Sequence, residues 1–454
     1  MKLGVVFGLL VAACGSESNS AVDAAPDASL DVDAPGIDAP PGPIRVTALR
    51  GGTPRAGTRV IVHDDDGAPV SDLVPDADGR ISIDADRPRT ITVAFAPEGP
   101  AGDRVLTFTV VAAAPGEQIV VDARLERPVV QGAITASYTL PMGTVGQEMD
   151  LGCVRRPFNN LVTEATVDII ETCPQGGTRF NALLTAVASQ QPAAWALFED
   201  QTTAADGAIA VSGWSTAFDS LPLTFTTPSV QLSDFSFGVR LALDGVWHDA
   251  DETGATSLPQ AGEAVSLRLP SGVGEAFHLH ARAAFGPPSG DGPVVRKPDV
   301  TAHWLGTTPP APDAIDFTAL DIPRVYDLGR DPTDTTGRTL TWREEGTPAE
   351  LAAVDGVTAD LSRFASNVLY RWQVVAPHGA TSSLRLPTLP DDLSARMPGT
   401  ADHSIELALV RIAAGGGGPA IRAQAGGWVR TAFNARPPVD AAFTSVVSSL
   451  VLDE

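Results

Sequence analysis

The chain has 454 residues, of which 43% are hydrophobic and 19% are charged, and its formal net charge is −24. That length gives room for about three domains of 100 to 200 residues, each able to bury a core. The acidic balance argues against a nucleic-acid partner, because binding to phosphates depends on Lys and Arg. The counts of Gly and Pro, 43 and 38, favour many short strands joined by turns, so the composition indicates an all-β protein.

The first residues are typical of an export signal. Met1-Lys2 gives a positive start, residues 3–13 are apolar or Gly, and small residues precede Cys14. The apolar run is far shorter than the roughly 20 residues that span a bilayer as a helix, and it suits a signal peptide. It resembles the lipobox of bacterial lipoproteins, and this resemblance implies a signal over residues 1–14 and a lipid on Cys14. The alternative is a chance cysteine after a hydrophobic N-terminus.

Residues 15–43 contain six acidic residues, five prolines and no basic residue. Such a segment cannot repay the entropy of ordering, so we expect a disordered tether. In the lipoprotein family, an Asp after the lipidated cysteine favours retention in the inner membrane. Gly15 stands at that position here, so the resemblance implies the cell envelope, with the outer membrane favoured over the inner.

From Ile44 on, apolar and polar residues alternate in short runs: 44–49, 58–63, 80–83, 90–95, 105–111 and 118–125. This period of two predicts strands, and Asp66-Gly67 and Asp78-Gly79 predict tight turns between them. The chain over 44–126 is therefore predicted to form a small β-sandwich. Residues 52–54, 57, 60, 66–70 and 76–80 resemble a carboxypeptidase-regulatory-like domain, a transthyretin-like, Ig-type sandwich. Its members are accessory spacers or binding modules, so the resemblance implies no catalytic residues.

Acidic residues gather in the turns of this segment, at Asp64–Asp66, Asp76 and Asp78. Clustered carboxylates suit Ca²⁺, but the residue order of an EF-hand is absent. Turn-forming Asp is the alternative, and we favour it.

The strand pattern continues beyond Arg127, and residues 286–293 are the strongest break in it. We predict one or two further β-sandwich-type domains, with a boundary that divides 127–290 from 291–454. Residues 180–189 are ambiguous between helix and strand, because a short apolar run cannot decide between them. Ser266–Pro270 and Ser383–Pro387 share the sequence SLRLP, which indicates either a duplication or a coincidence.

The chain has three cysteines, and Cys14 is assigned to the anchor. An exported protein lies in an oxidising compartment, so Cys153 and Cys173 are predicted to form a disulfide that stabilises by about 3 kcal/mol. Two separately buried thiols are the alternative.

Two sets of side chains could carry chemistry. His278 and His280 lie at i and i+2 of a predicted strand, on one face, where they could bind Zn²⁺ with Glu275 or His248 as a third ligand. The alternative is two half-exposed histidines on a sheet. Tryptophans could stack on sugars if they shared an exposed face, or pack in the core with satisfied N–H groups; they are Trp214, Trp247, Trp304, Trp342, Trp372 and Trp428.

The chain has no G-x-S-x-G, H-E-x-x-H or P-loop motif and no nucleotide fingerprint after a strand. We therefore predict a non-enzymatic structural or interaction module of the cell envelope, without a cofactor. Its partners would be the membrane, through the lipid, and an envelope protein or polysaccharide. A carbohydrate- or ligand-binding lipoprotein is the alternative, and a metal-dependent hydrolase around His278 and His280 is the third hypothesis.

Overall fold

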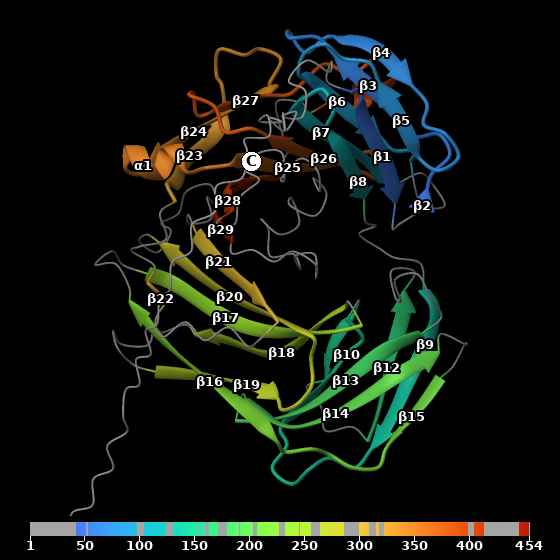
Figure 1. Ribbon diagram of the computed structural model, residues 1–454, viewed down its shortest axis with the longest axis vertical. Helices are drawn as coiled ribbons and strands as arrows, with labels where there is room; N and C mark the ends of the chain where they lie inside the picture. Colours follow the sequence, from blue (N-terminus) through green and yellow to red (C-terminus); the bar gives the residue numbers. More distant parts are fainter. Residues whose placement is uncertain are drawn as a thin grey trace, which may run out of the picture. The chain divides into compact units, whose positions relative to one another are not determined.

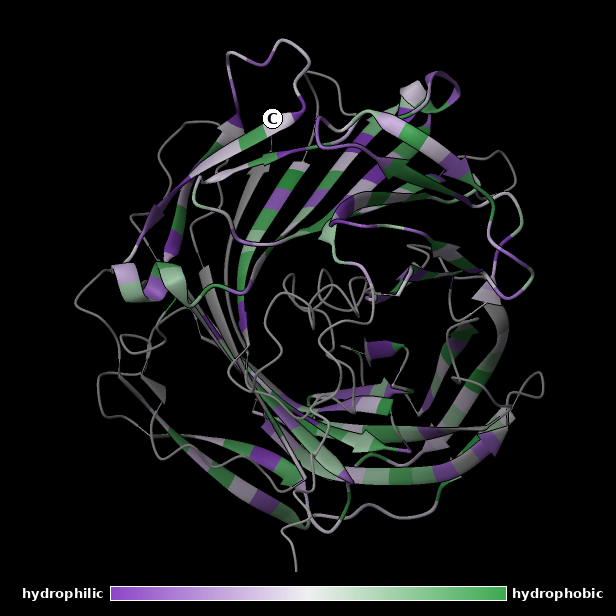
Figure 2. Ribbon diagram, turned by 45° about the horizontal axis from the view of Figure 1, so that its top comes forward, coloured by the Kyte–Doolittle hydropathy of each residue, from purple (hydrophilic) through white to green (hydrophobic). Residues whose placement is uncertain are grey.

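The computed structural model of the chain describes residues 42–50, 53–97, 104–123, 130–152, 154–158, 163–170, 179–189, 191–202, 207–226, 232–244, 246–255, 264–285, 299–307, 315–316, 322–397, 404–412 and 445–453. Most of these residues are in strands and few are in helices, so the prediction of an all-β protein with several sandwich-type sheets is confirmed. Apolar and polar residues alternate along many of the strands (Figure 2).

Twelve strands of the described part form the largest sheet (Figure 1). Their order is β18 (Val246–Ala255), β17 (Leu232–Leu243), β20 (Ala276–Phe285), β21 (Asp299–Gly306), β29 (Ser445–Asp453), β28 (Ser404–Ile412), β25 (Gly356–Ala365), β26 (Val368–Ala376), β7 (Arg104–Ala113), β6 (Arg89–Ala94), β3 (Arg59–His63) and β4 (Pro69–Leu73).

Smaller sheets accompany this one. The first joins β1 (Ile44–Arg50) to β2 (Thr53–Pro54), β5 (Arg80–Ile83) and β8 (Gln118–Ala123), and the second has the order β11 (Arg155–Phe158), β10 (Gly146–Asp150), β13 (Arg179–Ala188), β14 (Gln191–Thr202). The others are β12 (Glu164–Ile170), β9 (Val130–Tyr138), β15 (Gly207–Val211); β19 (Ala264–Pro270), β16 (Phe218–Thr226), β22 (Ile315–Asp316); and β23 (Arg324–Arg330), β24 (Thr339–Glu345), β27 (Ser383–Arg385).

Strands β1 to β8, which we call the N-terminal module, form a two-layered sandwich. The sheet around β1 packs on β3, β6 and β7, and the core between them includes Val46, Ile119, Val93 and Phe108. This arrangement follows from the alternation in the sequence, which gives each strand one apolar face toward its partner sheet.

Asp residues close the hairpins of this module. Asp76 Oδ1 accepts the backbone N–H groups of Asp78 and Arg80, at 3.0 and 2.7 Å. Asp64 Oδ1 accepts those of Asp66 and Ala68 in the same pattern. These carboxylates stabilise turns, and the described residues contain no group of three or more His, Cys, Asp or Glu side chains that could hold a metal ion.

The N-terminal module continues into the C-terminal part of the chain through one strand pair. Strands β7 and β26 are parallel, with pairs from Leu369–Arg104 to Val375–Val110. The second face of β3 and β6 is also covered, because Ile61 and Ala94 belong to the core that contains Leu340 and Leu386. Both faces of these strands are therefore buried, and the module shares its core with the segment 322–397.

Several sequence predictions have an outcome in the structure. Residues 180–188 are strand, as part of β13, and Ser189 lies in the turn after it. The helix α1 (Pro348–Ala352) and the 3₁₀ helix η1 (Asp391–Arg396) were not predicted. Leu267, Leu269, Leu384 and Leu386 of the two SLRLP segments are buried in the same core. Cys14, Cys153, Cys173 and nearly all of the tether lie outside the described residues, so the lipid and the disulfide stay predictions.

Candidate functional site

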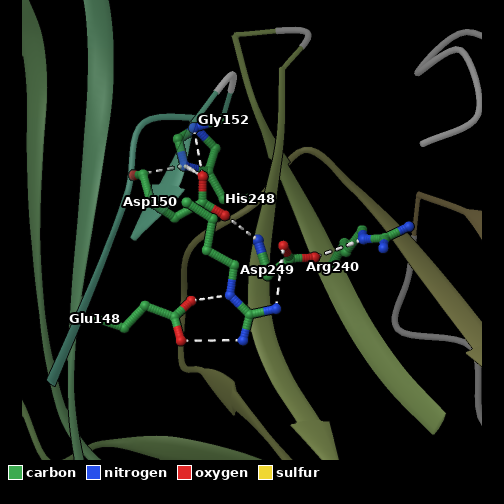
Figure 3. Close-up of polar contacts among 7 residues, drawn as sticks. Glu148, Asp150, Gly152, Arg240, His248 and Asp249 are labelled. Carbon is green, nitrogen blue, oxygen red and sulfur yellow. Dashed lines mark hydrogen bonds and ion pairs between the residues drawn. The ribbon is translucent and has the colours of Figure 1, made fainter. Parts of the chain in front are cut away.

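A network of charged side chains connects two sheets where β10 and the turn after it meet β18 (Figure 3). Glu148 and Asp150 lie on β10, Arg155 lies on β11, Arg240 lies on β17, and Asp249 lies on β18. Strands β10 and β11 are antiparallel neighbours, as are β17 and β18, so each sheet contributes both signs of charge.

The charges alternate along the network. Arg155 binds the Glu148 carboxylate through two nitrogens, one of them at 3.0 Å from Oε2. Arg155 Nη1 also lies 3.4 Å from Asp249 Oδ2, and Arg240 Nε donates to Asp249 Oδ1 at 2.5 Å. Asp249 is therefore held between two guanidinium groups, with its side chain 9% exposed. Each buried charge thus has an opposite charge as its partner, which offsets the free energy cost of removing it from water.

Glu148 lies at the end of this series. Burial raises the pKa of its carboxyl group, because desolvation disfavours the charged form more than the hydrogen bond and charge of Arg155 favour it. The nearby carboxylates of Asp150 and Asp249 act in the same direction as burial. Glu148 thus binds a proton more readily than an exposed glutamate.

Asp150 connects the turn after β10 to strand β18 next to His248. Its carboxylate accepts the backbone N–H of Gly152 at 2.5 Å and that of Asp249 at 2.7 Å. His248 Nδ1 lies 3.2 Å from the carbonyl oxygen of Asp150, and the ring is buried. Gly152 has a φ of +76°, and a Cβ at this position would lie 2.2 Å from Val246 Cγ1, so the close approach of the two sheets requires glycine.

His278 and His280 lie on one face of β20, as the spacing predicted, with ring centroids 5.6 Å apart. Both are buried, which corrects the expectation of half-exposed rings. Arg240 Nη1 lies 3.4 Å from His278 Nδ1, and the ring of Trp247 lies next to that of His278, with centroids 5.7 Å apart. A guanidinium group at this nitrogen disfavours a metal cation. The third ligands considered from the sequence do not complete a site, since His248 contacts Asp150 and Glu275 is exposed.

An aromatic cluster lies beside the charged network. Its members include Tyr138, Phe158 and Trp214, next to Glu148, and they pack without leaving space for a water molecule. Tyr138 and Trp214 meet edge to face with centroids 6.0 Å apart, and Trp214 Nε1 donates to the carbonyl oxygen of Thr139 at 2.9 Å. Burial raises the pKa of Tyr138 to about 12, so this phenol stays protonated. The cluster is therefore part of the packed core, with Trp214 at its partly exposed edge.

Most of the described tryptophans pack in the core. Trp247, Trp342 and Trp372 are buried, and Trp342 Nε1 and Trp372 Nε1 donate to Glu344 and Thr109. The hypothesis of an exposed sugar-stacking row is wrong for these three, and Trp214 is the member that remains partly exposed. The side chains of Trp304 and Trp428 lie outside the described residues.

Sequence reasoning missed Arg240, Asp249 and Asp150 as members of one network. Residues 248–252 are mostly polar or charged, so Asp249 does not stand out in the sequence. Asp150 and Asp249 are 99 positions apart, so their contact could not be read from spacing, and the closer pair of Arg240 and Asp249 depends on the antiparallel pairing of β17 and β18.

No family model and no curated protein matches the chain. The Bacillus anthracis TIE protein is similar at 10% identity, with 54% of this chain and 45% of that chain covered and a TM-score of 0.15, so the chain spans less than half of its length. A Ca²⁺-stabilized adhesin that helps an Antarctic bacterium bind ice is similar at 11% identity, with 82% of this chain and 95% of that chain covered and a TM-score of 0.13. Neither similarity carries an argument about this protein.

A search of the described residues for membrane-spanning helices gives none that is both long and apolar enough.

Proposed function

We propose that the chain is a lipid-anchored protein of the cell envelope that acts as a non-catalytic interaction module. The observation that carries the proposal is the order of its N-terminal segments: an apolar run, Cys14, an acidic Pro-rich stretch, and then the buried residue Ile44 at the start of β1. Folded sequence begins directly where the tether ends. A tether of this composition extends by self-repulsion, so the folded part can contact partners away from the membrane surface.

The chemistry of the charged network supports a structural role for it. Catalytic acids and bases have to reach a substrate. Asp249 and His278 are instead engaged with Arg240 inside the protein, and His248 contacts the turn at Asp150. We therefore assign this network to holding the sheet of β10 against the sheet of β17 and β18.

Cross-linking in living cells tests the interaction role. The unaltered chain, purified through a C-terminal tag, is expected to carry a reproducible envelope protein partner. Cys14→Ala removes the anchor and should lose that partner, whereas Ser20→Ala, a change in the tether, should retain it. Recovery of the same partner with Cys14→Ala, or of no partner with the unaltered chain, contradicts the proposal.

Carbohydrate binding is a second candidate function, and the partly exposed Trp214 favours it. Sugars stack on aromatic faces, and Trp214 is partly exposed at the edge of the aromatic cluster. Trp214→Ala should abolish binding to envelope polysaccharide in a pull-down. Trp195→Ala is the matched control, because Trp195 is also partly exposed and donates to a backbone carbonyl, that of Ala217. Equal binding by both variants excludes Trp214 as a sugar-binding residue.

A further inference from the structure

A chain of hydrogen bonds crosses four neighbouring strands of the twelve-stranded sheet. His63 Nε2 on β3 lies 2.9 Å from Thr92 Oγ1 on β6, which lies 2.9 Å from Thr109 Oγ1 on β7. Trp372 Nε1 on β26 donates to Thr109 Oγ1 at 2.9 Å. This last bond joins residues 263 positions apart and spans the parallel pair that connects the N-terminal module to β26.

The four side chains are enclosed by protein. His63, Thr92 and Thr109 are 0% exposed, and Trp372 is 3% exposed. Water therefore does not replace a partner that one of them loses, and the polar groups depend on one another.

The direction of these hydrogen bonds follows from which groups can donate. An indole nitrogen can only donate, so Thr109 Oγ1 accepts from Trp372. The continuous arrangement then has Thr109 donating to Thr92 and Thr92 donating to His63 Nε2. His63 Nε2 has to be an acceptor in that arrangement, so the ring is neutral with its hydrogen on Nδ1. A proton on Nε2 forces the Thr92 hydroxyl to donate to Thr109 Oγ1. The hydroxyl hydrogen of Thr109 then loses Thr92 Oγ1 as its acceptor.

The surroundings of His63 favour the neutral ring. Burial lowers the pKa of His63 to about 4, and the backbone of Gly67 and the charge of Asp64 offset part of this effect. Segment 322–397 contacts the turn after β3 that contains Gly67. Thr388 N donates to Gly67 O at 2.8 Å, and Arg338 Nη1 donates to Thr388 Oγ1 at 2.6 Å. Arg338 is thus the positively charged side chain that this segment places near the turn. In the turn itself, Asp65 is an exposed acid paired with Arg87.

We propose that the series of hydrogen bonds from His63 to Trp372 is an acid-sensitive latch: it holds the N-terminal module on β26 at neutral pH, and protonation of His63 releases it. A histidine with a lowered pKa stabilises the closed form above its ordinary pKa, and this contribution is lost as the pH falls. With the His63 pKa at about 4 in the closed form and about 6.5 in the open form, opening of the junction is on the order of 100-fold more frequent at pH 4 than at pH 7.

Amide hydrogen exchange of the full chain, corrected for intrinsic rates, tests the latch. In the unaltered protein, peptides from β7 and β26 should lose about 100-fold of their protection between pH 7 and pH 4, while peptides from β13 change less. His63→Gln cannot take up the proton and should abolish most of this loss. His378→Gln is the matched control: this histidine pairs with Glu344, outside the latch, and should leave the loss unchanged. Equal protection of the unaltered protein at both pH values, or an equal loss in His63→Gln, overturns the proposal.

A second variant keeps the test decisive if His63→Gln does not fold. Trp372→Phe removes the obligatory donor, so the two hydroxyls can reverse and accept a proton on His63. The His63 pKa, read by NMR among the seven histidines of the chain, should then rise by about half a unit to one unit. An unchanged His63 pKa contradicts the latch.

Discussion

Asp249 should be the most sensitive carboxylate of the charged network. Asp249→Asn keeps the shape of the side chain and leaves the backbone bond from Asp249 N to Asp150 in place, but it removes the charge between Arg240 and Arg155. Arg155 then keeps the carboxylate of Glu148, whereas the ion pair of Arg240 with Asp249 is lost. The substitution therefore tests whether the network stabilises the contact between the sheets.

The magnitude follows from the burial of the three groups. Breaking a buried ion pair costs about 3–5 kcal/mol. Arg240 and Asp249 are 12% and 9% exposed, whereas Arg155 is 31% exposed and can be hydrated in part. We therefore expect a loss of about 2–4 kcal/mol in the free energy of unfolding, or about 1 M in the urea midpoint.

Urea unfolding at pH 7, followed by tryptophan fluorescence, measures this loss. Asp327→Asn is the matched control, because Asp327 pairs with Arg343 at 2.8 Å with both side chains more than half exposed. Solvent screens such a pair, so its urea midpoint should not change. If the two variants have the same midpoint, the network contributes nothing and the reasoning is refuted.

Two further predictions concern turns. Gly152→Ala should lower the free energy of unfolding by more than about 2 kcal/mol, because a Cβ there meets Val246 Cγ1 and φ is positive. Gly143→Ala is the control, since its φ is also positive but a Cβ there meets open space. An equal loss of stability in both variants, measured by thermal unfolding, would argue against the contact with Val246. Asp76→Ala should cost about 1 kcal/mol through the two N–H groups that Asp76 accepts, whereas Asp78→Ala should cost less, and the opposite order in urea unfolding would contradict the turn assignment.

The strands and turns were predictable where the signal is local. Alternation from Ile44 on and the Asp-Gly pairs at 66–67 and 78–79 predicted the N-terminal sandwich. Residues 180–189 could not be assigned because β13 is buried along nearly its whole described length, and a strand covered on both faces reads as one apolar run. A missed signal was available for α1: Thr347 and Glu350 form a capping box, and the pattern T-x-x-E with Pro348 between them indicates a helix start.

The candidate site was predictable only within single strands. The spacing of His278 and His280 gave their common face, but the neighbour that decides their chemistry, Arg240, comes from β17. The junction of β7 with β26 likewise depends on pairing between residues more than 250 positions apart. Such contacts are set by packing of the whole chain, and one sequence carries no local trace of them.

Mass spectrometry of the N-terminal peptide, from protein purified out of the membranes of the cells that make it, tests the central claim most directly. We predict a peptide that begins at Cys14 and carries the added mass of acyl chains. The same protein should partition into the detergent phase, and Cys14→Ala should move it to the aqueous phase. A peptide that begins at Met1, with an unmodified Cys14, would contradict the account.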